Sequence, residues 1–256
     1  MSYLSLAFSL SKRQFSQNYK NSIFGLGWIF VHPIVIVSTY ILIFSAVFAS
    51  KMSYLGSAVS YGLYLCVGIV FWGYFNEIII NCMGAVRTNS NMIKKVKFPL
   101  STVFVSSVFM ASFNFVVIFG IFMIFFLFTG SPLKIDMILL LPLLLVQIFF
   151  ATTIGVFAGL LCVLIRDVTE FMRVVMHLWF WVTPIVYPLS ILPDKVQSAM
   201  SWNPLFPIIK SFHAILLGGS QVDWFSLSYP IAIGFVMFFL NIRIISRFKT
   251  ELLDEL

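Results

Sequence analysis

Long stretches without a single Asp, Glu, Lys or Arg recur along this chain of 256 residues. The hydrocarbon core of a bilayer is about 30 Å thick, so a helix rising about 1.5 Å per residue needs roughly 20 apolar residues to cross it. Each stretch can therefore hold one crossing. The stretches are Asn21–Ser50, Met52–Asn76, Phe98–Leu133, Met137–Ile165, Val174–Pro193 and Trp224–Ile242.

The composition points the same way. Charged residues make up 10% of the chain and hydrophobic residues 61%, whereas about 25% of a typical soluble domain is charged. So little charge excludes an ordinary soluble enzyme and a disordered protein. The net charge of +7 does not indicate nucleic-acid binding, because the basic residues form short clusters between apolar runs. We predict an all-α integral membrane protein, with residues 1–256 as one transmembrane domain.

Several chemical motifs are missing from the sequence. It has no G-x-x-x-x-G-K-[ST] phosphate loop, no H-E-x-x-H and no G-x-S-x-G. Its three cysteines, Cys66, Cys82 and Cys162, lie inside apolar stretches with neither disulfide nor zinc spacing. We therefore predict no catalytic residues, no metal site and no cofactor bound by this chain itself.

The stretch Val196–Val222 is apolar but contains Pro204, Pro207 and the pair Gly218-Gly219. Such residues favour two short helices that dip into the membrane and return. With this hairpin and six crossings, the predicted inner segments hold twelve Lys and Arg residues, against Lys51, Lys134, Lys195 and Lys210 outside. That balance satisfies the positive-inside rule with both termini in the cytoplasm.

Two inner segments have a second possible role. Residues 1–24 form a candidate amphipathic helix in which Leu4, Phe8, Phe15 and Tyr19 recur at helical spacing, although Ser11 interrupts the stripe. It would lie in the membrane interface, either as a plain anchor or beside a substrate entrance. Residues 88–98 encode one or two short basic turns, which either fix the topology or dock on a partner.

One acidic side chain, Glu77, falls within the expected spans, toward the inner end of the second. An acid inside the membrane is a candidate functional residue, but pairing with a basic neighbour explains it equally well. A proton relay needs a chain of such groups, which disfavours a proton- or sodium-driven transporter.

Aromatic residues near the middle of spans give a further indication. Trp72, Tyr74, Trp179 and Trp181 lie far from the interfaces where Trp and Tyr usually occur. Such indoles either pack between helices with their N–H groups bonded, or face a cavity that a substrate crosses. An uncharged aromatic passage would suit a sugar polymer.

Several motifs in order resemble the permeases of polysaccharide ABC exporters, the membrane subunits that export lipid-linked O-antigen, with capsule and teichoic-acid exporters as relatives. The resemblance covers nearly the whole chain. The residues that carry it are Asn18–Trp28 with Pro33, Arg166–Glu170, Phe180–Tyr187, Ile191–Pro193 and Trp202–Pro207.

This resemblance implies a six-span half-transporter of the bacterial inner membrane. It would form a homodimer and bind two copies of a separate ATPase, which holds ATP and Mg. The substrate would be a lipid-linked glycan, with membrane lipids as the other contact and no nucleic acid. The resemblance also explains the missing phosphate loop.

The resemblance further implies roles for individual residues. Residues 1–24 match the family's interface helix, 88–98 its coupling loop and 193–219 its outer gate hairpin. Candidate channel residues are Trp28, Phe30, Trp72, Trp179, Phe180, Trp181 and Tyr187. Candidate ATPase-coupling residues are Asn91, Ile93, Lys94, Lys95, Lys97 and Phe98. Arg13 and Lys20 are candidates for the lipid diphosphate, and Trp202, Pro204 and Pro207 for the outer gate.

Two other functions stay open. A membrane enzyme acting on polyprenyl-linked sugars would need an acid/base or metal set, for which the outer segments offer only Asp136, Asp194, Asp223 and His213. A drug or small-lipid exporter of the same architecture would lack a reason for the mid-span aromatic residues.

Overall fold

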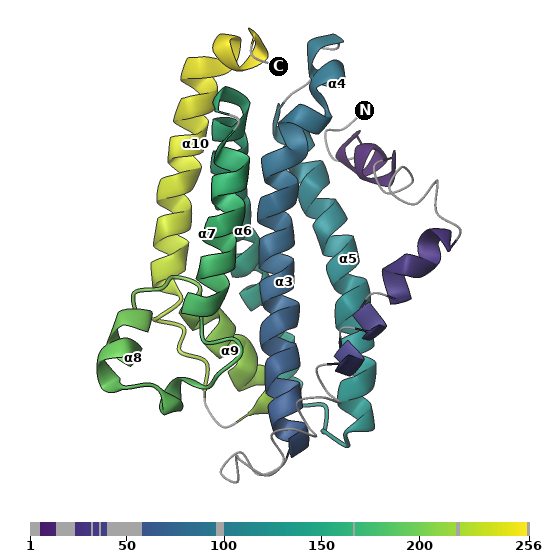
Figure 1. Ribbon diagram of the computed structural model, residues 1–256, viewed down its shortest axis with the longest axis vertical. Coiled ribbons are helices and arrows are strands. Elements are labelled where there is room, and N and C mark those ends of the chain that lie inside the picture. The colour runs from purple at the N-terminus through teal and green to yellow at the C-terminus, as the bar shows by residue number, and fades with distance from the viewer. Residues whose placement is uncertain are drawn as a thin grey trace.

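The computed structural model describes residues 6–13, 24–31, 33–35, 37–39, 58–95, 100–165, 167–218 and 221–254. All regular secondary structure in these residues is helical, and they contain no strand (Figure 1). Four helices in this part of the chain are long and apolar enough to cross a membrane, over Tyr61–Thr88, Leu100–Phe128, Ile135–Leu164 and Ser228–Arg247. They confirm the second, third, fourth and sixth predicted spans as membrane-length helices.

The helices run alternately along one long axis. Helix α3 (Ala58–Thr88) rises toward the short helix α4 (Ser90–Lys95), and α5 (Leu100–Phe128) returns. After the 3-10 turn η3 (Ile135–Leu139), α6 (Leu140–Leu164) rises and α7 (Val168–Val182) descends. Helix α10 (Ser228–Asp254) rises last, so α4 and the C-terminal part of α10 share one end, called here the α4 end. The opposite end carries α8 (Asp194–Met200) and α9 (Phe206–Leu217) and is called the α9 end.

The second span lies further along the chain than the sequence predicts. The charge-free run ends at Asn76, but α3 continues through Glu77 to Thr88. A helix tolerates a single acid when a neighbour bonds it, and Glu77 accepts a hydrogen bond from Asn114 of α5. The third span stops where expected, because α5 ends at Phe128 and Gly130 takes a φ of 75°.

The fifth predicted span, Val174–Pro193, is wrong in its bounds. Helix α7 covers Val168–Val182, which is 15 residues, and the chain leaves helical geometry at Thr183. Pro184 is the physical reason, because its ring removes a backbone donor and restricts the residue before it to extended geometry. The first predicted span, Asn21–Ser50, is described only in part, with helical backbone at 28–31, 33–35 and 37–39.

The proline-rich stretch after α7 forms two short helices, α8 and α9, as the sequence predicts. Pro207 lies in the first turn of α9, where a missing N–H does no harm. Helix α9 packs on α3 and α6, and its buried residues occupy nearly the whole helix. How deeply the pair enters the membrane stays a prediction.

The helical residues 6–13 near the N-terminus pack a face with small residues against the bundle. Ser11 does not interrupt the packed face but belongs to it, since Ala7, Leu10 and Ser11 are buried and Phe8 is 64% exposed. The Ser11 hydroxyl donates 2.9 Å hydrogen bonds to the carbonyl oxygens of Ala7 and Ser106. Phe8 is therefore left exposed, while the small residues face α5.

Two glycines on α6 let it approach α3 closely. A methyl group at Gly155 would come within 2.8 Å of the Cys82 Cβ, and one at Gly159 within 2.7 Å of the Cys82 carbonyl oxygen. Small residues four apart on one face are a common means of close helix packing in membranes. This contact between α3 and α6 is the centre of the described core.

We predict that Gly159→Ala lowers thermal stability, because its methyl group meets immobile backbone and overpacking costs about 1–3 kcal/mol. Gly120→Ala on α5 is the matched control, since nothing lies within 4 Å of its added methyl group and alanine favours helix. Melting of the detergent-purified protein, followed by size-exclusion chromatography after heating, measures both. Equal melting temperatures for the two variants would contradict the close contact at Gly159.

Candidate functional site

The chain leaves helical geometry between Thr183 and Pro188, at the α9 end of α7. Most of this segment is buried, and buried backbone that leaves helical geometry must bond its freed polar groups within the protein. Two tyrosines in the first turns of α3 supply these bonds. Tyr61 Oη donates to the carbonyl oxygen of Val186 over 2.7 Å, and Tyr64 Oη lies 3.2 Å from the carbonyl oxygen of Pro184.

The same segment is also held tightly by packing. Ile185 is fully buried, and a methyl group at Gly68 of α3 would come within 2.9 Å of its side chain. Only a glycine at position 68 lets the non-helical segment lie directly on α3. We call residues 183–188, together with Tyr61, Tyr64 and Gly68, the α7 break.

Asn203, between α8 and α9, connects that linker to the last turn of α7 and to the α7 break. Its Oδ1 accepts hydrogen bonds from the indole nitrogen of Trp179 at 2.8 Å and from the backbone N–H of Leu205 at 3.0 Å. Its Nδ2 donates to the Thr183 hydroxyl at 2.9 Å, and that hydroxyl donates to the carbonyl oxygen of Trp179. The buried Asn203 amide therefore links the last turn of α7, the α7 break and the linker between α8 and α9.

The predicted channel residues divide into a buried and an exposed group. Trp72 packs against Phe75 and Phe180, and Trp179 meets Phe75 edge to face with its N–H bonded to Asn203. These two indoles fit the packing interpretation within a single chain. Trp28, Phe30 and Trp181 are about half exposed, and Phe180 and Tyr187 are intermediate.

Two of these aromatic residues occupy a different place from the one predicted. Because α7 ends at Val182, Trp179 and Trp181 lie in its last turn next to the break, not in mid-span. The Tyr187 hydroxyl donates a hydrogen bond to the carbonyl oxygen of Trp181 over 2.5 Å. The break therefore fixes the backbone that carries the exposed Trp181 ring.

At the α4 end the structure places part of the predicted coupling loop. In α4, Ile93 is buried, whereas Asn91 and Lys94 are exposed. Arg13 lies beside this helix, with its Nη1 3.9 Å from the Met92 sulfur. The side chain of Lys95, and the residues Lys97, Phe98 and Lys20, lie outside the described part of the structure.

The predicted outer gate residues occupy the linker and the start of α9. Trp202 is 78% exposed, Pro204 is partly exposed and Pro207 is buried. The carbonyl oxygen of Trp202 accepts a hydrogen bond from the Tyr229 hydroxyl at the start of α10.

Glu77 has an amide partner and not the basic one that the sequence suggested. Asn114 of α5 donates to Glu77 Oε1 over 2.5 Å, and no Lys or Arg of the described residues lies within 4.0 Å of its carboxylate. One turn away, Tyr74 shares a 2.7 Å hydrogen bond with Ser112 of α5. The pair of bonds joins α3 to α5, so we interpret Glu77 as structural.

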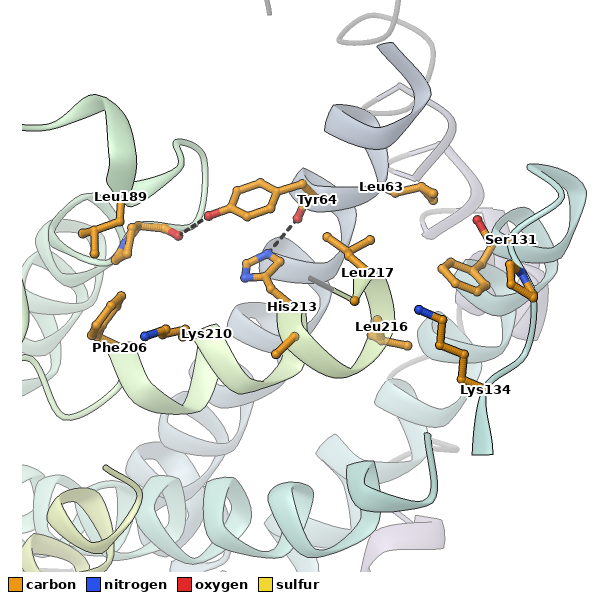
Figure 2. A pocket seen from close by; sticks show the side chains of 15 residues that line it. Leu63, Tyr64, Ser131, Lys134, Leu189, Phe206, Lys210, His213, Leu216 and Leu217 are labelled. Atoms are coloured by element: carbon orange, nitrogen blue, oxygen red, sulfur yellow. Dashed lines mark hydrogen bonds between the residues drawn. The ribbon is translucent and has the colours of Figure 1, made fainter. Parts of the chain in front are cut away.

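A cavity of about 460 Å³ opens at the α9 end, between the start of α3, α9 and the α5–η3 loop. Figure 2 shows Lys210 and Phe206 at one end of it and Lys134 at the other, with His213 between them. His213 Nε2 donates to the carbonyl oxygen of Tyr64 over 2.9 Å, and the two rings stack at 4.0 Å. The imidazole is thus engaged in attaching α9 to α3. Among the described residues, no three His, Cys, Asp or Glu side chains group as a metal ion would require.

Sequence reasoning missed the three residues whose side chains hold the α7 break in place, Asn203, Tyr61 and Tyr64. Asn203 lies inside the Trp202–Pro207 motif, which contributes to the family resemblance. Only the structure shows that the Asn203 amide bonds the indole of Trp179. Tyr61 and Tyr64 are spaced three apart in an apolar run, and nothing local distinguishes them from interfacial tyrosines.

Comparison with known proteins adds a family and several relatives. The model of a family described as ABC-2 type transporter matches residues 5–217. The chain is 25% identical to an O-antigen export system permease protein RfbA of Klebsiella pneumoniae over 242 residues, which cover 94% of this chain and 90% of the relative. It is 24% identical to RfbA of Myxococcus xanthus over 83% of this chain and 80% of the relative. It is 20% identical to the polysialic acid transport protein KpsM of Escherichia coli, over 86% and 84%.

We predict that Asn203→Ala lowers the melting temperature, because it removes a buried side chain that makes three hydrogen bonds, leaving groups unpaired at about 1–3 kcal/mol each. Trp179→Phe, which removes one of those donors, should have a smaller effect. Gln221→Ala, at an exposed position in the loop before α10, is the control and should melt like the unaltered protein. A stability of Asn203→Ala equal to that of the control would contradict the role given to this amide.

Proposed function

This chain belongs to the ABC-2 type transporter family, and we propose on that premise that it is the membrane subunit of an ATP-driven exporter of a lipid-linked polysaccharide. The match of a family model to most of the chain carries the proposal. The relatives named for O-antigen export and polysialic acid transport support a polysaccharide as cargo. Because the sequence has no phosphate loop, ATP and Mg belong to a separate ATPase partner, and this chain translocates without being an enzyme.

We propose six crossings in the bacterial inner membrane with both termini in the cytoplasm. The four long helices account for four of them, and the stretch Asn21–Ser50 and α7 with its break for the other two. Charge supports the orientation. Elements at the α4 end carry Lys12, Arg13, Arg87, Lys94, Arg173, Arg243 and Arg247, whereas those at the α9 end carry Lys134, Lys195 and Lys210. The positive-inside rule then puts the α4 end in the cytoplasm.

Helix α4 is the proposed contact with the ATPase. Buried Ile93 anchors it to the bundle, and exposed Asn91 and Lys94 face outward, followed by Lys95, Lys97 and Phe98. Arg13 lies next to α4, so the N-terminal segment belongs to the same surface. Arg13 and Lys20 are also the cations proposed to meet the lipid diphosphate at the cytoplasmic interface.

The proposed substrate passage forms between two copies of this chain. Trp28, Phe30 and Trp181 present exposed aromatic faces, and Phe180 and Tyr187 flank Trp181. Such faces bind the apolar sides of sugar rings without fixing a charged group. Trp72 and Trp179 support this wall from behind, and Trp202, Pro204 and Pro207 belong to the gate at the α9 end. ATP drives transport by favouring one arrangement of the paired subunits through contacts that differ between the two states.

Two of the four candidate groups for a membrane enzyme, His213 and Asp223, are engaged in local structure. His213 donates to a backbone carbonyl and is stacked on Tyr64. Asp223 accepts hydrogen bonds from the Ser226 hydroxyl and from the backbone N–H groups of Ser226 and Phe225, which hold its pKa below the usual value. Both side chains therefore serve local structure.

We predict that the purified chain forms a complex of two copies with two ATPase subunits, and that ATP hydrolysis is coupled to the assembled complex. Replacing Lys94, Lys95 and Lys97 together by Glu should reduce ATPase association about tenfold or more, because it reverses three charges at the docking surface. Co-purification followed by a mass measurement of the complex tests both points.

Lys195→Glu, an exposed lysine of α8 at the opposite end, is the control for that variant and should assemble normally. Normal assembly of the triple variant would remove α4 from the interface. A chain that never associates with an ATPase would contradict the exporter itself and favour the enzyme alternative.

We predict that Trp181→Ala lowers export about fivefold while leaving assembly with the ATPase intact, since one lost aromatic contact is worth about 1 kcal/mol. Trp224→Ala is the matched control, because Trp224 is 48% exposed against 52% for Trp181 but lies in the loop before α10. Immunoblotting of surface polysaccharide measures export. Equal export by both variants would limit Trp181 to a packing role.

A further inference from the structure

The cavity at the α9 end combines an apolar lining with two separate ammonium groups. Lys134 and Lys210 lie at its two ends, as Figure 2 shows. Between them the wall is mostly apolar, with Leu63, Phe126, Leu216 and Leu217. A free soluble anion would gain nothing from such a lining, whereas an amphiphile uses both the cations and the apolar surface.

Neither lysine is neutralised by a carboxylate. In the part of the chain that the structure describes, no Asp or Glu oxygen lies within 4.0 Å of Lys134 or Lys210. Asp223 interacts electrostatically with Lys210, but it does not line this cavity and it bonds to the residues that follow it in its own turn. The cavity therefore keeps a net positive charge.

The contacts that position the two lysines leave N–H donors free. The Lys134 ammonium lies against Gly218, just past the C-terminus of α9, where a helix carries partial negative charge. The Lys210 ammonium lies 5.8 Å from the centre of the Phe206 ring. An ammonium has three donors, and these contacts do not use them all.

The two cations are too far apart for one phosphate. Lys210 and Gly218 are eight residues apart on or next to α9, which is about 12 Å along a helix, and Lys210 reaches toward Phe206, away from Lys134. A single phosphate joins two ammonium nitrogens no more than about 8 Å apart, from two contacts of about 2.8 Å and its own O···O edge. The spacing requires two phosphate groups joined by a linker.

The cavity lies at the ends of helices long enough to cross a membrane, which is the level expected of lipid phosphates. Its walls come from the ends of membrane-length helices: Tyr64 is near the start of α3, Phe126 is in the last turn of α5, and Lys134 directly precedes the span Ile135–Leu164. Leu133 and Ile135 on either side of Lys134 are exposed, as expected for residues entering the bilayer. Lysine side chains near the ends of membrane helices reach the interface, where lipid headgroups lie.

We propose that this cavity binds one membrane lipid that carries two linked phosphate groups, such as cardiolipin, with Lys134 and Lys210 each contacting one phosphate. The bound lipid fills the space between α9, α3 and the α5–η3 loop and joins them. Binding is a property of this chain alone, so it does not depend on the exporter proposal. The exported lipid diphosphate is a second source of paired phosphates, but its phosphates are adjacent and span too little.

The experiment measures lipid binding to the full-length, delipidated protein by native mass spectrometry and by titration. The probes are cardiolipin, phosphatidylglycerol, phosphatidylcholine and undecaprenyl diphosphate. We expect one cardiolipin per chain, bound at least about tenfold more tightly than phosphatidylglycerol, since loss of one ion-paired phosphate removes about that factor. Lys134→Gln and Lys210→Gln should each weaken cardiolipin binding about tenfold.

Two controls separate charge from folding. Lys195→Gln removes an exposed lysine of α8 that does not line the cavity and should change nothing. The double variant Lys134→Arg/Lys210→Arg keeps both charges and should retain binding. Unchanged cardiolipin binding in the double glutamine variant would overturn the proposal, and so would equal affinity for phosphatidylglycerol. Tighter binding of undecaprenyl diphosphate, lost in the same variants, would overturn the resident lipid and assign the site to the cargo.

Discussion

The rest of the described bundle depends on how the non-helical segment after α7 satisfies its backbone. The buried carbonyl groups of a run such as Thr183–Pro188 need hydrogen-bond partners, because each unsatisfied buried group costs about 1–3 kcal/mol. Here the hydroxyls of Tyr61 and Tyr64 bond carbonyl groups of the segment, and the amide of Asn203 holds the Thr183 side chain. Those bonds allow α7 to stop after 15 residues, and they place the Trp181 ring on the surface and α8 and α9 at one end of the bundle.

Helix α3 is the element on which this arrangement is built. On one side it receives α6 through the close contact at Gly155 and Gly159, and on another it meets α5 through the bonds from Glu77 and Tyr74. Its first turns hold the α7 break and α9. Helix α3 thus contacts several neighbouring helices, each at a different level along its length. These contacts explain why it is the most buried of the four long helices.

The sequence predicts the parts of this fold that depend on length and charge. Four spans follow from their apolar runs, and Gly130 and the prolines around α9 mark real boundaries. Prediction fails where one distant side chain decides the outcome. The second span extends past Glu77 because Asn114 bonds it, and the fifth ends early because Pro184 breaks a helix whose apolar composition continues. Likewise, Ser11 is counted as an interruption until Ser106 is seen to accept its hydrogen bond.

The bonds at the α7 break join residues 125 positions apart in the chain, and this separation gives the molecule a required order of assembly. A chain is synthesised from its N-terminus, and its earlier segments fold first. Tyr61 and Tyr64 therefore enter the membrane well before Pro184 and Val186 leave the ribosome. The segment with unpaired carbonyls is made only when the helix that bonds them is already present, so its carbonyl groups find their partners as soon as the segment folds.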